Sequence, residues 1–387
     1  MKKPLNTILV GAGGYGSFYI GLLMDKAIEG LNFAAVVDPY AKNALEYNRF
    51  KDVIPVYDHM DDFLASGAKA DLTIVSSPLH LHYTQSAQAL KSGSHVLCEK
   101  PLVPTIAELD SLEEIAASSN TTLSVGFQWC YSSAMHSVKK RILSGEFGKP
   151  LCLKAFVCTH RDWKYYHRGV GWAGKIKSKE GYTVYDSVVS NATSHYLQNM
   201  LFLLGPNMEE SAVLSNVRAE NYRANDIESF DTCVMQGETN GTKVFFATTH
   251  AANYRIDPVM HYSFENATIL VNYLKNDYTC TIHHKDGRIE ELGHFLSDGD
   301  KNKLELTAQA IRGEGPLICS ARTVRPFTAL VEFLFEQVPI VNFPDEYVVK
   351  DEVERHTYVK NLFLDMYDCF VYEKLPSEMG MPWAGCV

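Results

Sequence analysis

The sequence has 387 residues, with 36 Lys and Arg against 46 Asp and Glu, which gives a formal net charge of −10. At about 150 residues per domain, this length predicts two large domains. A hydrophobic content of 46% with 21% charged residues excludes a disordered or fibrous chain. The acidic balance argues against a nucleic-acid-binding protein, which needs a basic surface to meet phosphates.

Cysteine spacing and the apolar segments predict the compartment. The nine cysteines include no CxxC pair and no cluster with His at zinc-ligand spacing, so we expect no metal site. Scattered thiols are typical of a reducing compartment. The apolar run Leu5–Val10 is too short for a signal peptide, and no stretch approaches the roughly 20 residues of a membrane span. We therefore expect a cytoplasmic protein with no membrane contact.

The first third of the chain alternates short apolar strands with helices. This order is typical of a doubly wound parallel sheet with helices on both faces, and it predicts an N-terminal Rossmann domain over residues 1–126 of an α/β protein. The predicted strands are Thr7–Val10, Phe33–Val37, Ala70–Ser76, Ser94–Leu97 and Thr121–Val125, and the predicted helices are Phe18–Ala27, Tyr83–Lys91 and Thr105–Ser118.

The hydrophobic pattern is different in the remaining residues, which we assign to an α+β domain over 127–387. Longer alternating runs joined by Asn, Gly and Asp turns predict a large, mainly antiparallel open sheet. The predicted strands are Leu151–Thr159, Thr232–Gln236, Lys243–His250, Met260–Phe264 and Thr268–Tyr273. Helical periodicity is found at Ser132–Leu143, Ser190–Leu204, Lys301–Arg312, Thr323–Glu336 and Lys350–Tyr367.

A glycine-rich segment between the first strand and the first helix has the spacing of a dinucleotide-binding turn. In G-x-G-x-x-G, the glycines allow a tight turn, close approach to a pyrophosphate and close helix packing. Asp38 ends the second strand, where a carboxylate binds the adenosine ribose and repels a 2′-phosphate, which favours NAD over NADP. The alternative is a purely structural turn. The segment consists of Gly11, Ala12, Gly13, Gly14, Tyr15 and Gly16.

Two further strands end in polar segments that are predicted to reach the nicotinamide end of the cofactor, because ligands bind beyond the carboxyl ends of parallel strands. Ser77, Pro78 and His82 follow one strand. Glu99 and Lys100 follow the next. For His82 a structural role is an equally good interpretation.

These motifs together resemble the Gfo/Idh/MocA family of glucose–fructose oxidoreductase and inositol dehydrogenase relatives. The resemblance rests on Gly11–Gly16, Pro78-x-x-x-His82, Ala89–Pro101 and Val125–Phe127, and it thins beyond the first 150 residues. It implies NAD(P)-dependent oxidation or reduction of sugars and polyols, usually by dimers or tetramers. It also implies catalysis by the Lys of Glu-Lys-Pro, here Lys100, with an Asp-x-x-x-His pair.

The Asp-x-x-x-His pair is altered in this chain. His195 matches the histidine, but Asn191 stands in place of the aspartate. The i, i+4 spacing predicts that both lie on one face of a helix. An amide orients a ring or binds a hydroxyl, but it lacks the charge that would raise the imidazole pKa. Asp186, five residues before Asn191, is a candidate replacement, and His195 also has a purely structural interpretation.

A basic and aromatic stretch follows the first strand of the second domain. Between positions 160 and 179 it holds six Lys or Arg and one acid. Aromatic faces stack on sugars, and cationic side chains donate to hydroxyls or carboxylates. The stretch is either a carbohydrate-recognition loop, with an acidic sugar as one candidate ligand, or a solvated basic loop or subunit contact. The candidate substrate-binding residues are Arg161, Trp163, Tyr166, Arg168, Trp172 and Lys175.

The sequence therefore predicts an NAD-dependent dehydrogenase that transfers a hydride between nicotinamide and a hydroxyl or ketone of a sugar, polyol or sugar derivative. A glycoside-cleaving or epimerising enzyme that uses bound NAD transiently is the first alternative. A non-catalytic NAD-bound sensor, motivated by Asn191, is the second. The expected assembly is a homodimer or homotetramer.

Overall fold

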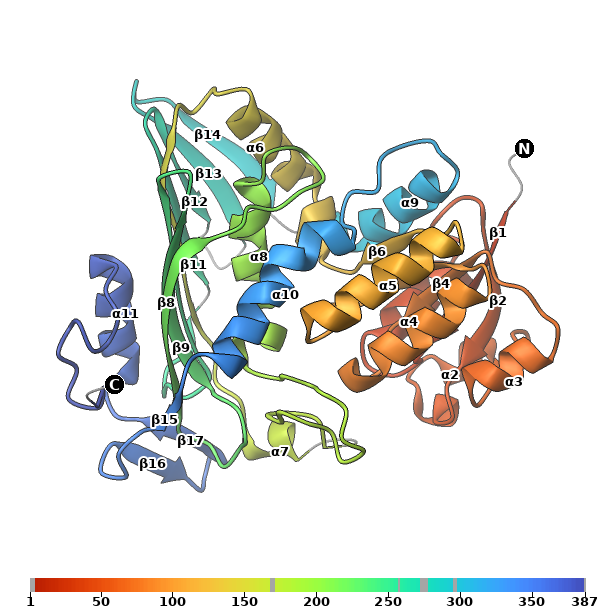
Figure 1. Cartoon of the computed structure of the whole chain (residues 1–387), viewed down its shortest axis with the longest axis horizontal. Coiled ribbons are helices and arrows are strands. Elements are labelled where there is room, and N and C mark those ends of the chain that lie inside the picture. The colour runs from red at the N-terminus through yellow and green to blue at the C-terminus, as the bar shows by residue number, and fades with distance from the viewer. Residues whose placement is uncertain (1–3, 168–170, 257, 272–277, 295–297, 386–387) are drawn as a thin grey trace. The chain divides into compact units, whose positions relative to one another are not determined.

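The computed structural model describes residues 4–167, 171–256, 258–271, 278–294 and 298–385. The chain forms two compact units, and each has its own large sheet (Figure 1). The first unit consists of Met1–Tyr131 and Asp298–Arg325, and the second of Ser132–Ser297 and Pro326–Val387. Within the described residues, every helix is too short or too polar to cross a bilayer.

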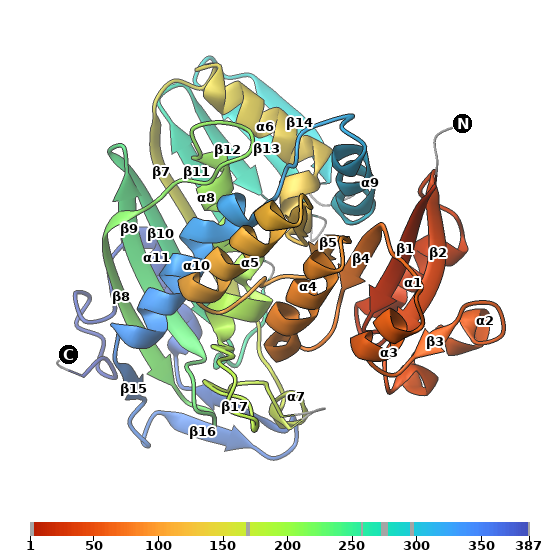
Figure 2. The same cartoon turned by 45° about the vertical axis from the view of Figure 1, so that its right-hand side comes forward.

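The first unit contains a six-stranded parallel sheet, as predicted for a Rossmann domain. Its strand order is β3-β2-β1-β4-β5-β6 (Figure 2). The chain begins at β1, extends the sheet through β2 and β3 on one side, and then adds β4, β5 and β6 on the other, which is the doubly wound arrangement. The central strands are buried except at the first residues of β1 and β5, and near-continuous apolar runs form them. The strands are β1 (Leu5–Val10), β2 (Leu31–Val37), β3 (Val56–Tyr57), β4 (Leu72–Val75), β5 (His95–Cys98) and β6 (Leu123–Val125), and the helices are α1 (Gly16–Met24), α2 (Tyr47–Phe50), α3 (Met60–Ala65), α4 (His82–Lys91) and α5 (Ile106–Ser118).

A segment from late in the sequence completes this unit. Asp298–Arg325 includes α9 (Gly299–Ile311) and the start of α10 (Ala321–Glu336). Leu304 of α9 is fully buried in the same core as residues of β1, β2 and α1. The backbone N–H of Val125 also donates to Cys319 O at 2.8 Å. This division differs from the continuous domains 1–126 and 127–387 expected from sequence, because the contacts of α9 are with the first unit.

The second unit contains a nine-stranded sheet in order β14-β13-β12-β11-β7-β10-β9-β8-β15, counted over the described residues. Only the pairs β7–β10 and β8–β15 of that sheet are parallel, which confirms the mainly antiparallel prediction. The strands are β7 (Pro150–Cys158), β8 (Ser215–Arg223), β9 (Thr232–Thr239), β10 (Thr242–Thr249), β11 (Val259–Phe264), β12 (Ala267–Val271), β13 (Thr279–His284), β14 (Ile289–His294) and β15 (Ile340–Asn342). The helices before the C-terminal segment are α6 (Ser133–Leu143), α7 (Trp163–Tyr166) and α8 (Ser194–Leu203).

The two faces of this sheet are covered by different parts of the unit. In Figure 1, α6 and α8 lie on one face and α11 (Leu362–Tyr372) lies on the other. Phe370 of α11 packs at 6.1 Å from the Phe156 ring of β7. Trp383, which is almost fully buried, packs on Tyr222 of β8. The C-terminal segment therefore belongs to the core of the second unit.

The prediction of one helix over Lys350–Tyr367 was wrong. A hairpin of β16 (Val348–Asp351) and β17 (His356–Val359) occupies its first half, and α11 begins only at Leu362. The carboxylate of Asp351 accepts the backbone N–H groups of residues 353 and 354, which makes a turn. Arg355 and Asn361 have positive φ values of 53° and 60°, which helices do not tolerate in their interior. Local turn chemistry therefore overrides the helical periodicity.

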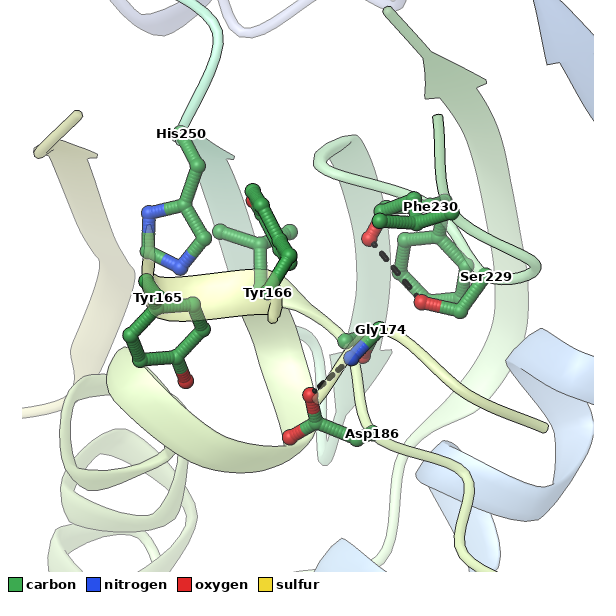
Figure 3. Close-up of a pocket in the computed structure, with 10 residues that line it drawn as sticks. Tyr165, Tyr166, Gly174, Asp186, Ser229, Phe230 and His250 are labelled. Atoms are coloured by element: carbon green, nitrogen blue, oxygen red, sulfur yellow. Dashed lines mark hydrogen bonds between the residues drawn. The ribbon is translucent and has the colours of Figure 1, made fainter. Parts of the chain in front are cut away.

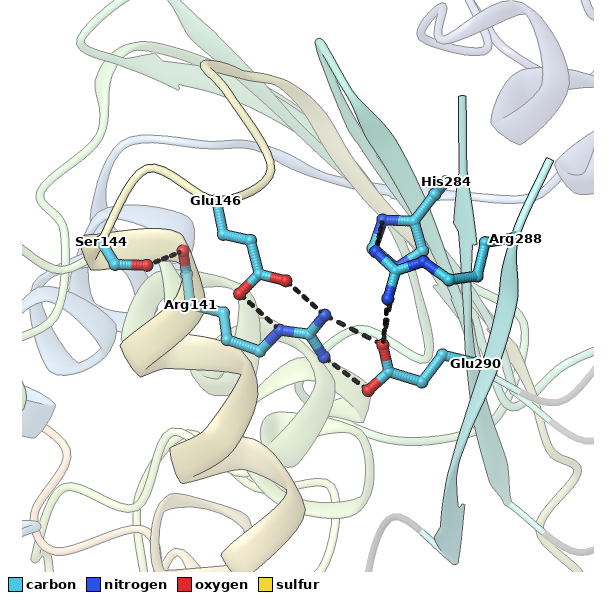
Figure 4. Close-up of polar contacts among 6 residues, drawn as sticks. All are labelled: Arg141, Ser144, Glu146, His284, Arg288 and Glu290. Atoms are coloured by element: carbon cyan, nitrogen blue, oxygen red, sulfur yellow. Dashed lines mark hydrogen bonds and ion pairs between the residues drawn. The ribbon is translucent and has the colours of Figure 1, made fainter. Parts of the chain in front are cut away.

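An ion-pair cluster fixes α6 to the edge strand β14 (Figure 4). The Arg141 guanidinium makes two hydrogen bonds to Glu146 and two to Glu290, all between 2.6 and 2.9 Å. These bonds lower the pKa of both carboxyl groups. Charges along an exposed strand edge oppose pairing with another chain. We assign the cluster to the fold, because it contains none of the predicted site residues.

Candidate functional site

The glycine-rich turn is packed tightly on one side and open on the other. Gly11 has φ +89°, and a Cβ there would lie 2.7 Å from the backbone of Ser76 and Ser77. A Cβ on Gly16 would lie 2.1 Å from the carbonyl oxygen of Gly11. A Cβ on Gly13, by contrast, would meet nothing within 4 Å. Two glycines thus let the turn pack on itself and on the end of β4, and the third leaves backbone open to a ligand.

Asp38 is held against this turn. Its carboxylate accepts the backbone N–H of Ala12 at 2.7 Å and that of Tyr40 at 2.7 Å. The contact joins the end of β2 to the glycine-rich turn. The first turn of α1, which begins at Gly16, contains no acidic residue, so the positive end of the helix dipole suits a phosphate.

His82 joins the two predicted nicotinamide segments. Its ring nitrogens lie 2.9 Å from Ser77 O and 2.8 Å from Pro101 O, so the ring bridges the ends of β4 and β5. The side chain is only 2% exposed, and this burial lowers its pKa. The contacts give His82 a structural part in shaping the site, which was one of its two interpretations from sequence.

Glu99 and Lys100 lie directly after β5. Glu99 is buried, and its carboxylate accepts the Tyr19 hydroxyl at 2.6 Å and the backbone N–H of Lys100 at 3.3 Å. It also accepts Lys303 Nζ of α9 at 2.6 Å. Lys303 and Tyr19 were not among the residues predicted from the sequence. Lys303 lay in a helix assigned to the other domain, and nothing in its local pattern marks it.

In the second unit, Asn191 and His195 do not share one regular helix, so that prediction was wrong. Asn191 lies in η4 (Val188–Ala192), a π-helical turn, and His195 is the second residue of α8. Thr193 between them has φ −108° and ψ 10°, outside the helical range. The Ser187 side chain caps the η4 turn by accepting the Ser190 N–H at 3.1 Å. π-Helical turns often occur at functional sites.

Asn191 is paired with the acid that the sequence offered as a replacement. Its Nδ2 donates to Asp186 Oδ1 at 2.9 Å and to the Tyr165 hydroxyl at 3.3 Å. The other Asp186 oxygen accepts the Gly174 N–H at 2.6 Å, and the Asp186 side chain is 3% exposed. The Asp186 carboxylate therefore lies beside Asn191 and accepts a hydrogen bond from its amide.

A small pocket of about 200 Å³, including its opening to solvent, lies beside this pair. Figure 3 shows Tyr165 and His250 on one side, Ser229 and Phe230 on the other, and Asp186 with Gly174 below them. Tyr166 also lines the pocket, and its buried hydroxyl has no hydrogen-bond partner within the described residues. His250 donates from Nδ1 to Thr159 O at 2.7 Å, and burial lowers its pKa to about 3. The pocket thus has neutral polar groups and one carboxylate.

The other predicted substrate residues make contacts inside the second unit. The Trp163 indole N–H donates to Thr357 Oγ1 at 3.0 Å. Lys175 Nζ pairs with Glu228 at 2.9 Å, and the Arg161 guanidinium lies 4.6 Å from the Tyr165 ring. Trp172 is half-buried. Arg168 lies outside the described residues.

The structure thus brings the predicted cofactor residues together at the carboxyl ends of β1, β2, β4 and β5. It brings Tyr166 and Asn191 to one part of the second unit through their shared neighbours Tyr165 and Asp186. The convergence of Lys100 and His195 on one substrate, which involves both units, stays a prediction.

Comparisons with known proteins agree with this geometry. Residues 5–127 match the model of the GFO/IDH/MocA oxidoreductase family with an NAD-binding Rossmann fold. An inositol 2-dehydrogenase from Streptomyces avermitilis is 30% identical over 216 residues, which cover 55% of this chain and 57% of that protein. An NADP(+) scyllo-inositol 2-dehydrogenase from Bacillus subtilis is 26% identical over 247 residues, 61% of this chain and 62% of that protein.

One solved structure extends the similarity in fold to most of the chain. The WlbA dehydrogenase from Bordetella pertussis, in complex with NADH and UDP-GlcNAcA, superposes with a TM-score of 0.70 and 20% identity. The match covers 86% of this chain and 96% of that one. At this identity the likeness concerns the fold alone. Residues 5–127 of this chain are thus similar to the NAD-binding Rossmann domain of the GFO/IDH/MocA oxidoreductases.

Proposed function

We propose that this protein is an NAD-dependent oxidoreductase that transfers a hydride between nicotinamide and a hydroxyl or keto carbon of a neutral sugar or polyol. The observation that carries the proposal is the glycine-rich turn, whose open Gly13 lies beside the N-terminus of α1 and whose Ala12 is held by Asp38. The dehydrogenases that match this chain support the same reaction class.

The residues present fit a dinucleotide. The open backbone at Gly13 and the positive end of the α1 dipole would hold the pyrophosphate, and Asp38 would accept from the adenosine ribose. A carboxylate at that position disfavours a 2′-phosphate, so we assign NAD rather than NADP. When bound, the nicotinamide supplies the hydride acceptor or donor.

The chain's own residues would move the proton. In our proposal the His195 imidazole takes the proton of the substrate hydroxyl, and the Lys100 ammonium stabilises the developing alkoxide. Asn191 orients the substrate or the ring. Asp186 supplies the negative charge that position 191 lacks, because its carboxylate lies 2.9 Å from the Asn191 amide.

The pocket beside Asp186 favours a neutral substrate. A carboxylate or phosphate entering it would meet the buried charge of Asp186, whereas a hydroxyl would find acceptors and the unpartnered Tyr166 hydroxyl. This observation favours a neutral polyol or sugar over the acidic sugar considered from the basic loop.

We also propose that the protein acts in the cytoplasm as a homodimer or homotetramer. None of the cysteines in the described ranges forms a disulfide, and most are buried, which supports a reducing compartment. Light scattering on the purified protein tests the assembly.

A turnover assay tests the activity. Purified protein with NAD and a panel of inositols, hexoses and hexitols should form NADH, and Lys100→Ala should lower kcat about 1,000-fold. The same substitution should change the dissociation constant of NAD only a few-fold. The matched control is Lys91→Ala, at an exposed lysine on α4, which should leave both quantities unchanged.

Two other outcomes identify the alternatives. Cleavage or epimerisation of a sugar without net NADH would indicate transient use of the cofactor. NAD binding with no conversion of any polyol, sugar or keto-sugar would contradict the proposed reaction and leave a non-catalytic NAD-binding protein.

A further inference from the structure

A buried lysine lies beneath the cofactor segments of the first unit. Lys303 of α9 is fully buried, and its Nζ donates to Glu99 Oε1 at 2.6 Å and to the Tyr15 hydroxyl at 3.2 Å. The same ammonium lies 4.4 Å from the centre of the Tyr15 ring and 5.0 Å from that of Tyr19. Lys303 therefore contacts both the glycine-rich turn, which contains Tyr15, and the residue that precedes Lys100.

The two oxygens of Glu99 have different partners. Oε1 accepts from Lys303 and from Tyr19, each at 2.6 Å. Oε2 accepts the backbone N–H of Lys100 at 3.3 Å. A Cβ on Gly126 would lie 2.7 Å from Oε1, so the end of β6 closes the remaining side. Lys303 thus fixes the orientation of a carboxylate that in turn contacts the Lys100 backbone.

We propose that Lys303 is a positioning residue of the cofactor site, which fixes the Glu99 carboxylate and thereby holds the Glu99–Lys100 segment and Tyr15 in their binding geometry. The proposal rests on the proposed NAD site. Its physical reason is that a buried carboxylate without a cation takes up a proton or turns towards water, and either change moves the backbone it contacts.

The other titratable groups around Glu99 do not supply this charge. Tyr15 and Tyr19 approach from the start of α1, His82 from α4, and Cys98 from the end of β5. Burial raises the pKa of both tyrosines and of Cys98, and it lowers that of His82. All four groups are therefore neutral near pH 7, whereas Lys303 is a cation whose Nζ lies 2.6 Å from the carboxylate.

The test measures NAD binding directly, by calorimetric titration from about pH 6 to about pH 9, the range that covers the raised pKa of an uncompensated buried carboxylate. Lys303→Met should weaken NAD binding about 10- to 100-fold at neutral pH. Affinity should recover as the pH rises, because Glu99 then ionises without its partner. The wild-type protein should not show this recovery of NAD affinity over the same pH range.

Two further variants separate positioning from general destabilisation. Lys139→Met removes an equally buried lysine of α6, which donates to Glu210 O at 2.7 Å, and it should leave NAD affinity and its pH profile as in wild type. In a Glu99→Gln background, adding Lys303→Met should cost no further affinity, because the residue acts through Glu99. If Lys303→Met alone does not fold, the comparison of Glu99→Gln with the double variant still tests the proposal.

Contrary outcomes are distinct. If wild type binds NAD and Lys303→Met binds it equally well, or with a loss that is the same at every pH and also appears on top of Glu99→Gln, the positioning role is overturned. If wild type itself does not bind NAD, the proposed function fails first, and this inference fails with it.

Discussion

The candidate site of the first unit is formed mainly by backbone atoms, and that of the second unit by side chains. In the first unit, backbone makes the site: Gly11 and Gly16 are required by contacts of 2.7 and 2.1 Å that a Cβ would make, and Asp38 binds main-chain N–H groups. In the second unit, side chains from separate segments make it, with Tyr166, Asp186 and His250 around one pocket. A backbone site tolerates few residue types at fixed spacing, whereas a side-chain site allows many solutions. In our proposal the first site binds the cofactor and the second sets the substrate.

The largest expected effect tests the backbone site by two glycine substitutions that the structure separates. Gly13→Ala places its methyl in open space, so the unfolding free energy should stay within about 0.5 kcal/mol, while NAD affinity should fall about 100-fold because the pyrophosphate needs that space. Gly16→Ala should lower the unfolding free energy by about 1–3 kcal/mol even without NAD, because the methyl meets Gly11 O. Urea unfolding and NAD titration measure both.

Gly21→Ala, on the same helix with nothing within 4 Å, is the matched control and should leave NAD binding unchanged. Equal NAD affinity in Gly13→Ala and wild type would contradict a backbone-built phosphate site.

A smaller effect is expected at the side-chain site. Tyr166→Phe removes a buried hydroxyl that has no partner within the described residues, so it should not destabilise the fold. If this hydroxyl binds a substrate hydroxyl, KM should rise about tenfold with little change in kcat, which corresponds to one lost hydrogen bond. Steady-state kinetics with the best polyol measure this. Tyr372→Phe, on the exposed side of α11, is the control, and an unchanged KM in Tyr166→Phe would remove the pocket from the substrate site.

The last effect concerns the pH dependence of the second unit, and it is absent at neutral pH. Burial lowers the pKa of His250 from 6.5 to about 3, so between these values the unfolded chain binds a proton that the folded chain excludes. The contribution of His250 to the unfolding free energy should therefore be complete above about pH 6.5. It should fall as the pH decreases, by up to about 1.4 kcal/mol per pH unit. His250→Asn should flatten that decline in urea unfolding, whereas the exposed His59→Asn should not. Parallel declines in wild type and His250→Asn would contradict a neutral buried His250.

The sequence allowed more to be predicted for the first unit than for the second, and the reason is physical. The order of strands and helices and the glycine-rich turn follow from contacts between residues close in sequence. The Lys303–Glu99 pair joins residues 204 positions apart, and no local pattern marks it. The π-helical turn at Asn191 and the hairpin at Val348–Val359 both contradicted regular periodicity, because caps and turns overrode it. The Tyr166 pocket depends on packing among several segments, which spacing alone does not reveal.

The return of Asp298–Arg325 to the first unit has a consequence for how the protein is made. Once the first 131 residues have been synthesised, all six strands of the parallel sheet are present. Leu304, which packs in the core, and Lys303, which pairs with Glu99, are still missing. The nucleotide half therefore reaches its final form only after most of the other half has been synthesised, and a fragment ending near residue 130 lacks part of its own interior.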